Sequence, residues 1–514
     1  MAVSIIPELL PCLQPHCCGF TPSLPTMTTT TGSPITTWTA NQLSQAIHAK
    51  AVSCREVMQA YLQRIAAVNP QVNAIVSLQS ETALLAQADL RDAQLARGES
   101  MGWMHGMPQA VKDLSNVAGL PTSSGSPLQR HFVPQEDGLM ASRLRAAGCI
   151  FIGKTNVPEF GLGSHTFNTV FGATRNPWNL AKTAGGSSGG AAAALAAHML
   201  PVADGSDFMG SLRNPAGWCN VVGMRPSQGR VPMWPVGDVF ISQLGTEGPM
   251  GRNVEDVAKL LEIQSGYAKN SPLSIADYWH FKLENNLKNL EEIKIGWLGD
   301  LNGYLPMEDG ILQVCQLAVQ RLQGAGCLVE PASLGSPEAL DKTWQAWLVW
   351  RRALVAGRLA PYLANPAHRA QLKPEALWEV DQAAALKGTE LMAASSQRTA
   401  FYQQMLQVFE TYDFLLLPSA QVWPFDIAER WPQTINGHAM DTYHRWMEVT
   451  IYATFAGLPA ICMPAGFGTE GAAKGLPMGL QIIGKPQADA AVLQLAQTYE
   501  AASGGLVQRR PAGL

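Results

Sequence analysis

Two glycine-rich loops that carry serines could supply the chemistry of a serine nucleophile. They span residues 185–190 (GGSSGG) and 205–211 (GSDFMGS). Between them, residues 191–200 are rich in alanine and have high helix propensity. The first loop should therefore lie at a helix N-terminus, where backbone N–H groups lack partners. A serine held in such a backbone, beside free N–H groups, has what a nucleophile and an oxyanion site require.

Strands and helices must position these loops, and the chain around them predicts such elements. Residues 200–203 (LPVA) predict a short buried strand before the second loop, and 149–152 predict another. Residues 138–147 predict a helix between that strand and the apolar pair Ala110-Val111. Further along, 414–417 and 480–483 are apolar enough for central strands. This alternation predicts an α/β fold with a largely parallel sheet.

Three motifs in this region resemble those of the amidase signature family. The family has a GGSSGG loop followed by a D-x-G-G-S-[IL]-R-x-P segment, and this chain has GGSSGG at 185–190 and DFMGSLRNP at 207–215. An upstream G-x-P-x-x-x-K-D segment completes the family pattern, and GMPQAVKD at 106–113 matches it. The resemblance runs from about residue 39 to the C-terminus.

The resemblance implies a hydrolase with a Ser-Ser-Lys triad. Ser211 would be the nucleophile, Ser187 would relay the proton after a cis peptide bond, and Lys112 would be the general base. Four backbone N–H groups would form the oxyanion hole, namely those of Phe208, Met209, Gly210 and Ser211. No metal or other cofactor is implied.

The residues themselves support this chemistry only in combination. A neutral serine hydroxyl is a weak nucleophile that needs a base, and Lys112 can serve only if burial keeps its amine neutral. Its neighbours Ala110, Val111 and Leu114 are apolar, which favours burial. Taken singly, Ser211 would be a turn serine and Lys112 a strand lysine with its amine in water. The three motifs in order favour catalysis.

Met209 departs from the family pattern, which usually has glycine at this position. A residue with a side chain adopts positive φ only at a cost, so we expect the oxyanion loop to differ in detail. We also expect Met209 to border the acyl pocket and to affect the range of substrates. Asp207 and Arg213 are predicted to brace the loop rather than contact substrate.

Composition excludes several other classes of protein. The net charge of the 514 residues is −4, so there is no basic surface for nucleic acid. No apolar run is long enough to span a bilayer, and no HExxH zinc motif occurs. The nine cysteines form neither a disulfide framework nor a CxxC pattern, which favours the cytoplasm. His198, inside the signature stretch, has no ligand spacing around it.

The predicted organisation is one large domain at 39–514 with the amidase signature fold. We expect a central mixed, mostly parallel twisted sheet covered by helices on both faces. Residues 106–232 would be the catalytic signature core, and 310–410 a variable helical region that shapes the substrate site, with Trp344, Trp347 and Trp350 in the core. Residues 1–38 predict a disordered extension; an upstream start before a natural Met27, or a short targeting segment, are alternatives.

The expected activity is hydrolysis of a non-peptide carboxylic amide, of the acylamide amidohydrolase type. Aryl amides, esters and carbamates pass through the same tetrahedral intermediate and are included. The expected partner is a small-molecule amide, without nucleic acid or membrane, and many relatives form homodimers. The alternative within the family is the glutamine-hydrolysing A subunit of an amidotransferase, which acts with partner subunits. A nucleotide-binding loop is disfavoured because Ala191-Ala192 stands where a P-loop has Lys-Ser/Thr.

Overall fold

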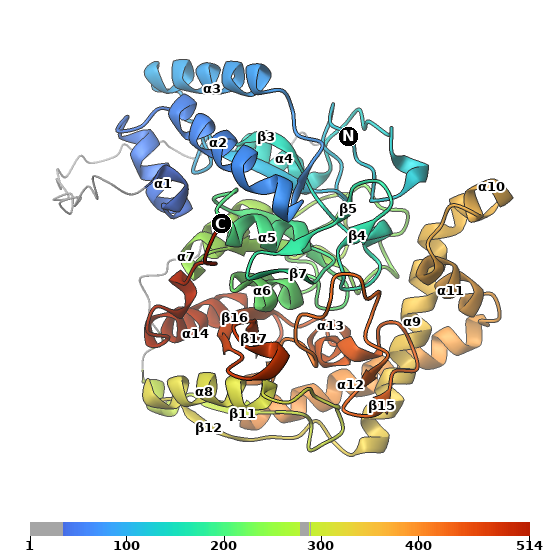
Figure 1. The fold of residues 1–514 in the computed structure, drawn as a ribbon. Coiled ribbons are helices and arrows are strands. Elements are labelled where there is room, and N and C mark those ends of the chain that lie inside the picture. The colour runs from blue at the N-terminus through green and yellow to red at the C-terminus, as the bar shows by residue number, and fades with distance from the viewer. Residues whose placement is uncertain (1–33, 278–286, 288) are drawn as a thin grey trace, which may run out of the picture. The chain divides into compact units, whose positions relative to one another are not determined.

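The computed structural model describes residues 34–277, 287 and 289–514, all within one folded unit (Figure 1). Most of the predicted N-terminal extension, residues 1–33, lies outside the described residues. Its last residues are part of the folded unit, because Ile35–Thr37 forms a 3-10 helix and Arg252 donates a hydrogen bond to the carbonyl oxygen of Trp38.

A mixed eight-stranded sheet is the centre of the described unit. In spatial order its strands are β12 (Leu328–Pro331), β11 (Lys294–Trp297), β13 (Phe414–Pro418), β17 (Pro477–Gly484), β16 (Ala460–Phe467), β9 (Val222–Arg225), β10 (Thr246–Gly251) and β8 (Ala203–Asp207). Every residue of β13 and β17 is buried, as expected for strands covered on both faces. The predicted central strands at 414–417 and 480–483 are confirmed.

The mixed character of the sheet is confirmed, but the expected predominance of parallel pairing is not observed. Within this sheet, β11 pairs in parallel with β12 and β13, whereas the other described neighbours pair antiparallel. The expectation assumed a helix between successive strands. However, β9 leads to β10, and β16 to β17, without an α-helix between them. Parallel neighbours need a long crossover connection, usually a helix, whereas antiparallel neighbours do not.

A smaller sheet brings the upstream motif beside the large one. Its order is β1 (Ile75–Val76), β3 (Ile150–Thr155) and β2 (Pro108–Lys112), and β2 and β3 are parallel with α4 (Leu139–Ala146) between them in the chain, as predicted. From β2, the side-chain amide of Gln109 and the backbone N–H of Lys112 donate to the two carboxylate oxygens of Asp204 in β8. These bonds hold Lys112 next to the serine-bearing loops.

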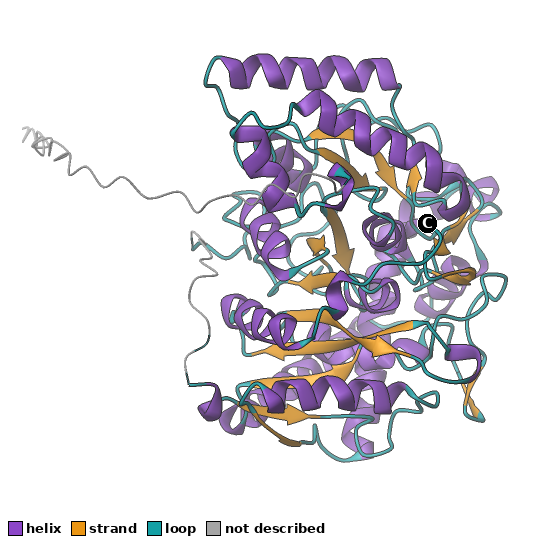
Figure 2. Ribbon diagram, turned by 60° about the vertical axis from the view of Figure 1, so that its left-hand side comes forward, coloured by secondary structure: helices purple, strands orange, loops and turns teal. Residues whose placement is uncertain are grey.

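Helices cover both faces of the large sheet, as predicted (Figure 2). Helix α6 (Arg213–Cys219) packs on β9, β16 and β17, while α8 (Ile311–Gly324) and α14 (Asp489–Ala502) also pack on β16 and β17. Other helices are α1 (Ala40–His48), α2 (Cys54–Val72), α3 (Glu81–Ala96), α5 (Gly189–Ala196), α7 (Val254–Gln264), α9 (Pro337–Leu363), α10 (Pro366–Arg369), α11 (Pro374–Ala383), α12 (Gly388–Thr411) and α13 (Ile451–Phe455). Short strand pairs join β4 (Phe167–Asn168) to β5 (Gly172–Ala173), β6 (Arg175–Asn176) to β7 (Asn179–Thr183), and β14 (Thr434–Ile435) to β15 (His438–Ala439).

The region at 310–410 is mostly helical, as expected. It contains α8, the edge strand β12 and helices α9 to α12. Trp344, Trp347 and Trp350 of α9 are all buried and belong to the hydrophobic core, which confirms their predicted packing role. Helix α9 thus has one face in the core and can present another face to the substrate site.

Candidate active site

Lys112 lies at the end of β2 and is fully buried. Its amine nitrogen Nζ is 2.9 Å from the hydroxyl oxygen of Ser187, 2.8 Å from that of Ser188 and 2.9 Å from that of Ser206. The carbonyl oxygen of Ser206 lies 3.2 Å from the same nitrogen. The lysine and the first predicted serine are therefore in direct contact, and two serines for which no contact with the lysine was predicted complete its surroundings.

Burial and the nearby carboxylates have opposite effects on the pKa of the Lys112 amine, and burial has the larger effect. Burial lowers the pKa of its amine to about 7, against the opposing effect of the carboxylates of Asp204, Asp207 and Glu247. A substantial fraction of the amine is therefore uncharged near pH 7 and has a lone pair available as a base.

The first loop positions Ser187 and Ser188 next to Lys112. The Gly186–Ser187 peptide bond is cis, as the resemblance implies. Ser188 occupies the N-cap position of α5 but makes no side-chain cap hydrogen bond. Its hydroxyl contacts the amine of Lys112 instead, and a Cβ at Gly205 would lie only 2.7 Å from the Ser188 hydroxyl oxygen. Glycine at 205 allows β8 to approach the loop this closely.

The second loop begins later than predicted. The strand expected at 200–203 is β8, which runs from Ala203 through Gly205 and Ser206 to Asp207 and pairs with β10. Gly205 to Asp207, which were predicted to be part of the loop because of their glycine and serine content, therefore belong to a strand. Propensity is a weak guide to a strand that is stabilised by its neighbour. Only the segment after Asp207 turns towards Ser211.

Asp207 holds this turn in place. Its carboxylate accepts hydrogen bonds from the backbone N–H groups of Gly210 and Leu212, at 2.8 and 3.2 Å. It also pairs with Arg213, at 3.0 Å, and with Arg225, at 3.4 Å, and all three of these side chains are buried. The two guanidinium groups lower the pKa of the Asp207 carboxyl strongly. These contacts agree with the prediction that Asp207 and Arg213 hold the loop in place.

Met209 does not strain the loop. The left-handed conformation falls on Gly210, with φ of +80°, and Met209 is not among the residues with positive φ. The N–H of Gly210 is already donated to Asp207, whereas the structure describes no hydrogen-bond partner for the N–H groups of Phe208, Met209 and Ser211. Of the four N–H groups expected to form an oxyanion hole, that of Gly210 is thus bonded within the protein, and the other three have no described partner.

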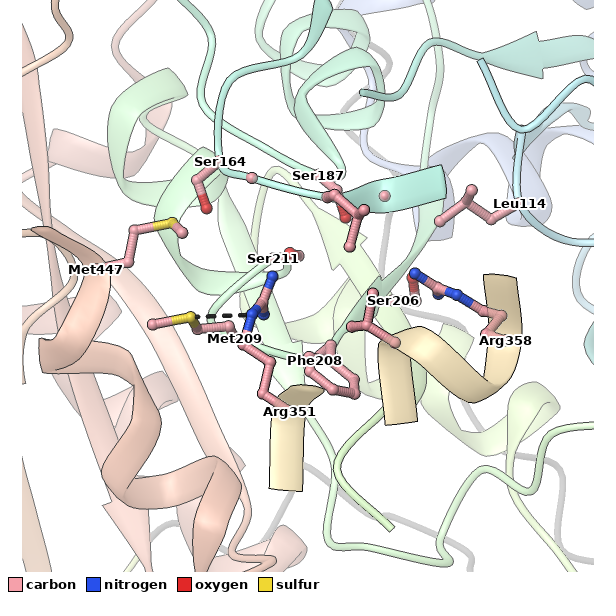
Figure 3. A pocket seen from close by; sticks show the side chains of 14 residues that line it. Leu114, Ser164, Ser187, Ser206, Phe208, Met209, Ser211, Arg351, Arg358 and Met447 are labelled. Carbon is pink, nitrogen blue, oxygen red and sulfur yellow. Dashed lines mark hydrogen bonds between the residues drawn. The ribbon is translucent and has the colours of Figure 1, made fainter. Parts of the chain in front are cut away.

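A pocket of about 470 Å³, including its open mouth, lies over this loop (Figure 3). Ser187 and Ser211 both line it, together with the side chains of Phe208 and Met209. In the part of the chain that the structure describes, no hydrogen bond joins the hydroxyls of Ser187 and Ser211 or engages the Ser211 hydroxyl. Ser211 thus faces the pocket, and Ser187 borders both the pocket and Lys112.

Helix α9, within the region 310–410 that was expected to shape the substrate site, supplies a wall of the pocket whose individual residues the sequence analysis did not name. Arg351, Val355 and Arg358 line the cavity from one face of this helix, since residues at i, i+4 and i+7 share a helical face. That spacing is visible in the sequence. Nothing in the sequence, however, indicates that this face meets the loop around Ser211, because the contact joins segments far apart in the chain.

Other classes of site find no support in the described residues. Across residues 34–277, 287 and 289–514, no group of three histidines, cysteines or acidic residues could hold a metal ion. No helix in the same ranges is long and apolar enough to cross a membrane. Ring nitrogen Nδ1 of His198 is 3.1 Å from the carbonyl oxygen of Thr36, and His198 does not line the pocket.

Comparisons with known proteins agree on one family. The family model described as Amidase matches residues 56–493. The A subunit of a glutamyl-tRNA(Gln) amidotransferase from Alkaliphilus metalliredigens is 33% identical over 483 residues, which cover 88% of this chain and 93% of the relative. An acylamidase from Rhodococcus erythropolis is 32% identical over 465 residues, which cover 90% and 94%. Among solved structures, a bacterial aryl acylamidase of the amidase signature enzymes family matches with a TM-score of 0.86 at 29% identity, covering 94% of this chain and 100% of the other.

Proposed function

Because this chain belongs to the amidase family, we propose that it hydrolyses the C–N bond of a non-peptide carboxylic amide through a serine acyl-enzyme. Aryl amides are the preferred class, and esters and carbamates share the same type of intermediate. The observation that carries the proposal is the buried amine of Lys112, 2.9 Å from the Ser187 hydroxyl, beside the pocket that Ser211 lines.

The contacts of Lys112 suit a neutral base. A neutral amine has two N–H donors and one lone pair. The donors can serve Ser188 and Ser206, and the lone pair can accept the hydroxyl proton of Ser187. When Ser211 attacks the carbonyl carbon, its proton passes to the Ser187 oxygen while the Ser187 proton passes to Nζ. The C–N bond then breaks, and the departing amine receives a proton back through the same relay.

Hydrolysis of the acyl-enzyme uses the same groups. A water molecule attacks the ester carbon and loses a proton through Ser187 to Lys112, and Ser211 regains a proton as the carboxylic acid leaves. The free backbone N–H groups of Phe208, Met209 and Ser211 are the proposed donors to the oxyanion in both steps. Each such donor contributes about 3–4 kcal/mol to stabilising the transition state.

The second candidate is the glutamine-hydrolysing activity that the named amidotransferase relatives suggest. Glutamine carries an ammonium group beside its α-carboxylate, and the ammonium prefers an anionic partner. The charged side chains that line the described pocket are Arg351 and Arg358, and no carboxylate lines it. This composition favours an acylamidase over a glutaminase.

The test uses the isolated chain without partner proteins. We expect release of 4-nitroaniline from 4-nitroacetanilide and no ammonia from glutamine. With 4-nitrophenyl acetate, quenched samples should carry one acetyl group on the peptide that contains Ser211. Ammonia release from glutamine without anilide turnover, or an acetyl group on another residue, would reject the proposal.

A further inference from the structure

Two arginines reach the pocket from the same face of α9, and they differ in how they are bound. Arg351 and Arg358 are separated by two helical turns, with Val355 between them (Figure 3). Both guanidinium groups border the cavity into which Ser211 faces. A cation in a substrate pocket either stabilises the protein or binds the substrate, and the partners of each arginine distinguish these roles.

Arg351 is held by other side chains of the protein through three contacts. Its Nε donates to Glu379 and its Nη2 to the hydroxyl of Tyr443, both at 2.5 Å, while Nη1 lies 3.8 Å from the sulfur of Met209. Arg351 is buried, and its charge is paired with the Glu379 carboxylate. This arginine forms part of the wall.

Arg358 is bound by a single hydrogen bond. Its Nη2 donates to the carbonyl oxygen of Phe160 at 2.8 Å. In the described ranges, no carboxylate lies within ion-pair distance of its guanidinium. Arg358 is also the exposed residue of the pocket lining, which places it at the mouth. Arginine has five N–H donors, so most of them stay available to an incoming group.

The charge of Arg358 is also not compensated by the rest of the pocket. The other charged lining residue is Arg351, and the remaining lining is apolar, hydroxyl or backbone. The guanidinium of Arg358 also acts electrostatically on the proposed base, because it contributes to lowering the pKa of Lys112. An anionic group on the substrate would neutralise this charge and could accept two parallel N–H donors of the guanidinium.

We propose that Arg358 is a specificity-determining residue that binds a carboxylate on the amide substrate. The inference rests on the proposed amidase function and names its substrate class: amides whose acyl or amine part carries an acid group within reach of the pocket mouth. Arg351 does not share this role because its charge is already paired with the Glu379 carboxylate.

Two matched pairs of substrates test the proposal and separate the two ends of the amide. N-succinyl-4-nitroanilide is compared with N-butyryl-4-nitroanilide, and 4-acetamidobenzoate with 4-acetamidotoluene. In at least one pair we expect kcat/KM of the charged member to exceed that of the neutral member by about tenfold or more. Arg358→Gln should bring this ratio close to one, and Arg358→Lys should retain part of it. The matched control is Arg352→Gln, on the same helix but outside the pocket lining, which should keep the wild-type ratio.

The outcomes are distinguishable from failure of the proposed function. Neutral substrates preferred in both pairs, or a ratio that Arg358→Gln leaves unchanged, would overturn the specificity role while leaving the amidase function intact. Absence of turnover for every compound would count against the amidase function instead. In that case, calorimetric binding of 4-acetamidobenzoate still decides the inference: Arg358→Gln should weaken it about tenfold or more, and equal binding would overturn it.

Discussion

The surroundings of Lys112 and the face of α9 that borders the same pocket differ in how completely their polar groups are held. Lys112 is buried against three serine hydroxyls, and its own backbone N–H is bonded to Asp204. Arg358 on α9 keeps one hydrogen bond and remains exposed. Arg358 lines the pocket, and Lys112 lies behind it, in contact with the lining residues Ser187 and Ser206.

This difference suits the surroundings of Lys112 to proton transfer and the α9 face to substrate recognition. Proton transfer needs groups fixed within a few tenths of an ångström, which buried and fully bonded elements provide. Recognition of a substrate group needs donors that are not already used by the protein. The region around Lys112 is built from the three sequence motifs, whereas α9 lies in the variable helical region. Variants of Ser211, Lys112, Asp207 and Glu247 test this difference, and their expected effects decrease in that order.

Replacing Ser211, the proposed nucleophile, should abolish activity without disturbing the pocket. Ser211→Ala should lower kcat by about 10⁴-fold or more, with an unchanged thermal unfolding midpoint, because the Ser211 hydroxyl makes no hydrogen bond in the described structure. Steady-state anilide hydrolysis measures the effect. Ser164→Ala, at another pocket-lining serine, is the control and should stay within about tenfold of wild type. Equal losses in the two variants would show that Ser211 is not the nucleophile.

Removing the base tests the region around Lys112 directly. Lys112→Ala should lower kcat/KM by about 10²–10⁴-fold. In the wild type, kcat/KM should fall as the pH drops below about 7, because burial lowers the pKa of Lys112 to about 7 and the protonated amine has no lone pair. A pH profile of both proteins gives the measurement. A Lys112→Ala enzyme with wild-type rates from neutral to alkaline pH would exclude the lysine as base.

Breaking the brace of the oxyanion loop should affect stability as well as activity. Asp207→Ala leaves the guanidinium groups of Arg213 and Arg225 buried without their carboxylate, which costs about 3–5 kcal/mol of the free energy of unfolding. Urea denaturation measures this loss. The control is Asp89→Ala, whose pair with Arg55 is largely exposed and should cost less than about 1 kcal/mol. Similar losses in both variants would contradict the bracing role.

The smallest expected effect is a shift of the pH profile. Glu247 accepts a hydrogen bond from the Ser115 hydroxyl at 2.5 Å and pairs across β8 and β10 with Ser206. Burial raises the pKa of its carboxyl to about 7, so it titrates together with Lys112.

Glu247→Gln removes a negative charge that favours the ammonium form of Lys112. The neutral amine should then persist to lower pH, and the acid limb of kcat/KM should move to lower pH. Glu255→Gln, at an exposed glutamate that accepts a hydrogen bond from Asn41, is the control and should leave the limb in place. An unchanged or alkaline-shifted limb in Glu247→Gln would contradict the coupling.

Local sequence was sufficient for several elements. Ser53 and Glu56 have the spacing of a capping box, and this box is present at the start of α2. Local signals can also mislead: Asn69-Pro70 is typical of a helix end, but α2 continues to Val72 and ends at Asn73 in the left-handed conformation. A proline in the last turn removes one hydrogen bond without preventing the turn, and the side chain of Asn69 caps the following residues.

The features that could not be predicted from the sequence depend on contacts between segments that are distant in the chain. Ser188 and Ser206 carried no signal as partners of Lys112, because their positions depend on the approach of β8 to the first loop. The use of the Gly210 N–H by Asp207 likewise depends on the geometry of the turn. The antiparallel pairings of the large sheet follow from strand order, which local patterns do not encode.

The sequence alone identifies the family and the candidate catalytic residues, because both follow from residue types and their spacing along the chain. Only the tertiary structure shows that Lys112 is buried among three hydroxyls, with its pKa lowered to about 7. Only the tertiary structure shows that Arg358 lies at the mouth of the pocket with a single hydrogen bond. Burial and the presence or absence of a countercharge depend on packing between segments that lie far apart in the sequence, 75 positions for Lys112 and Ser187 and 198 for Arg358 and Phe160. They are properties of the folded chain, and they set the pKa of the base and the charge offered to the substrate.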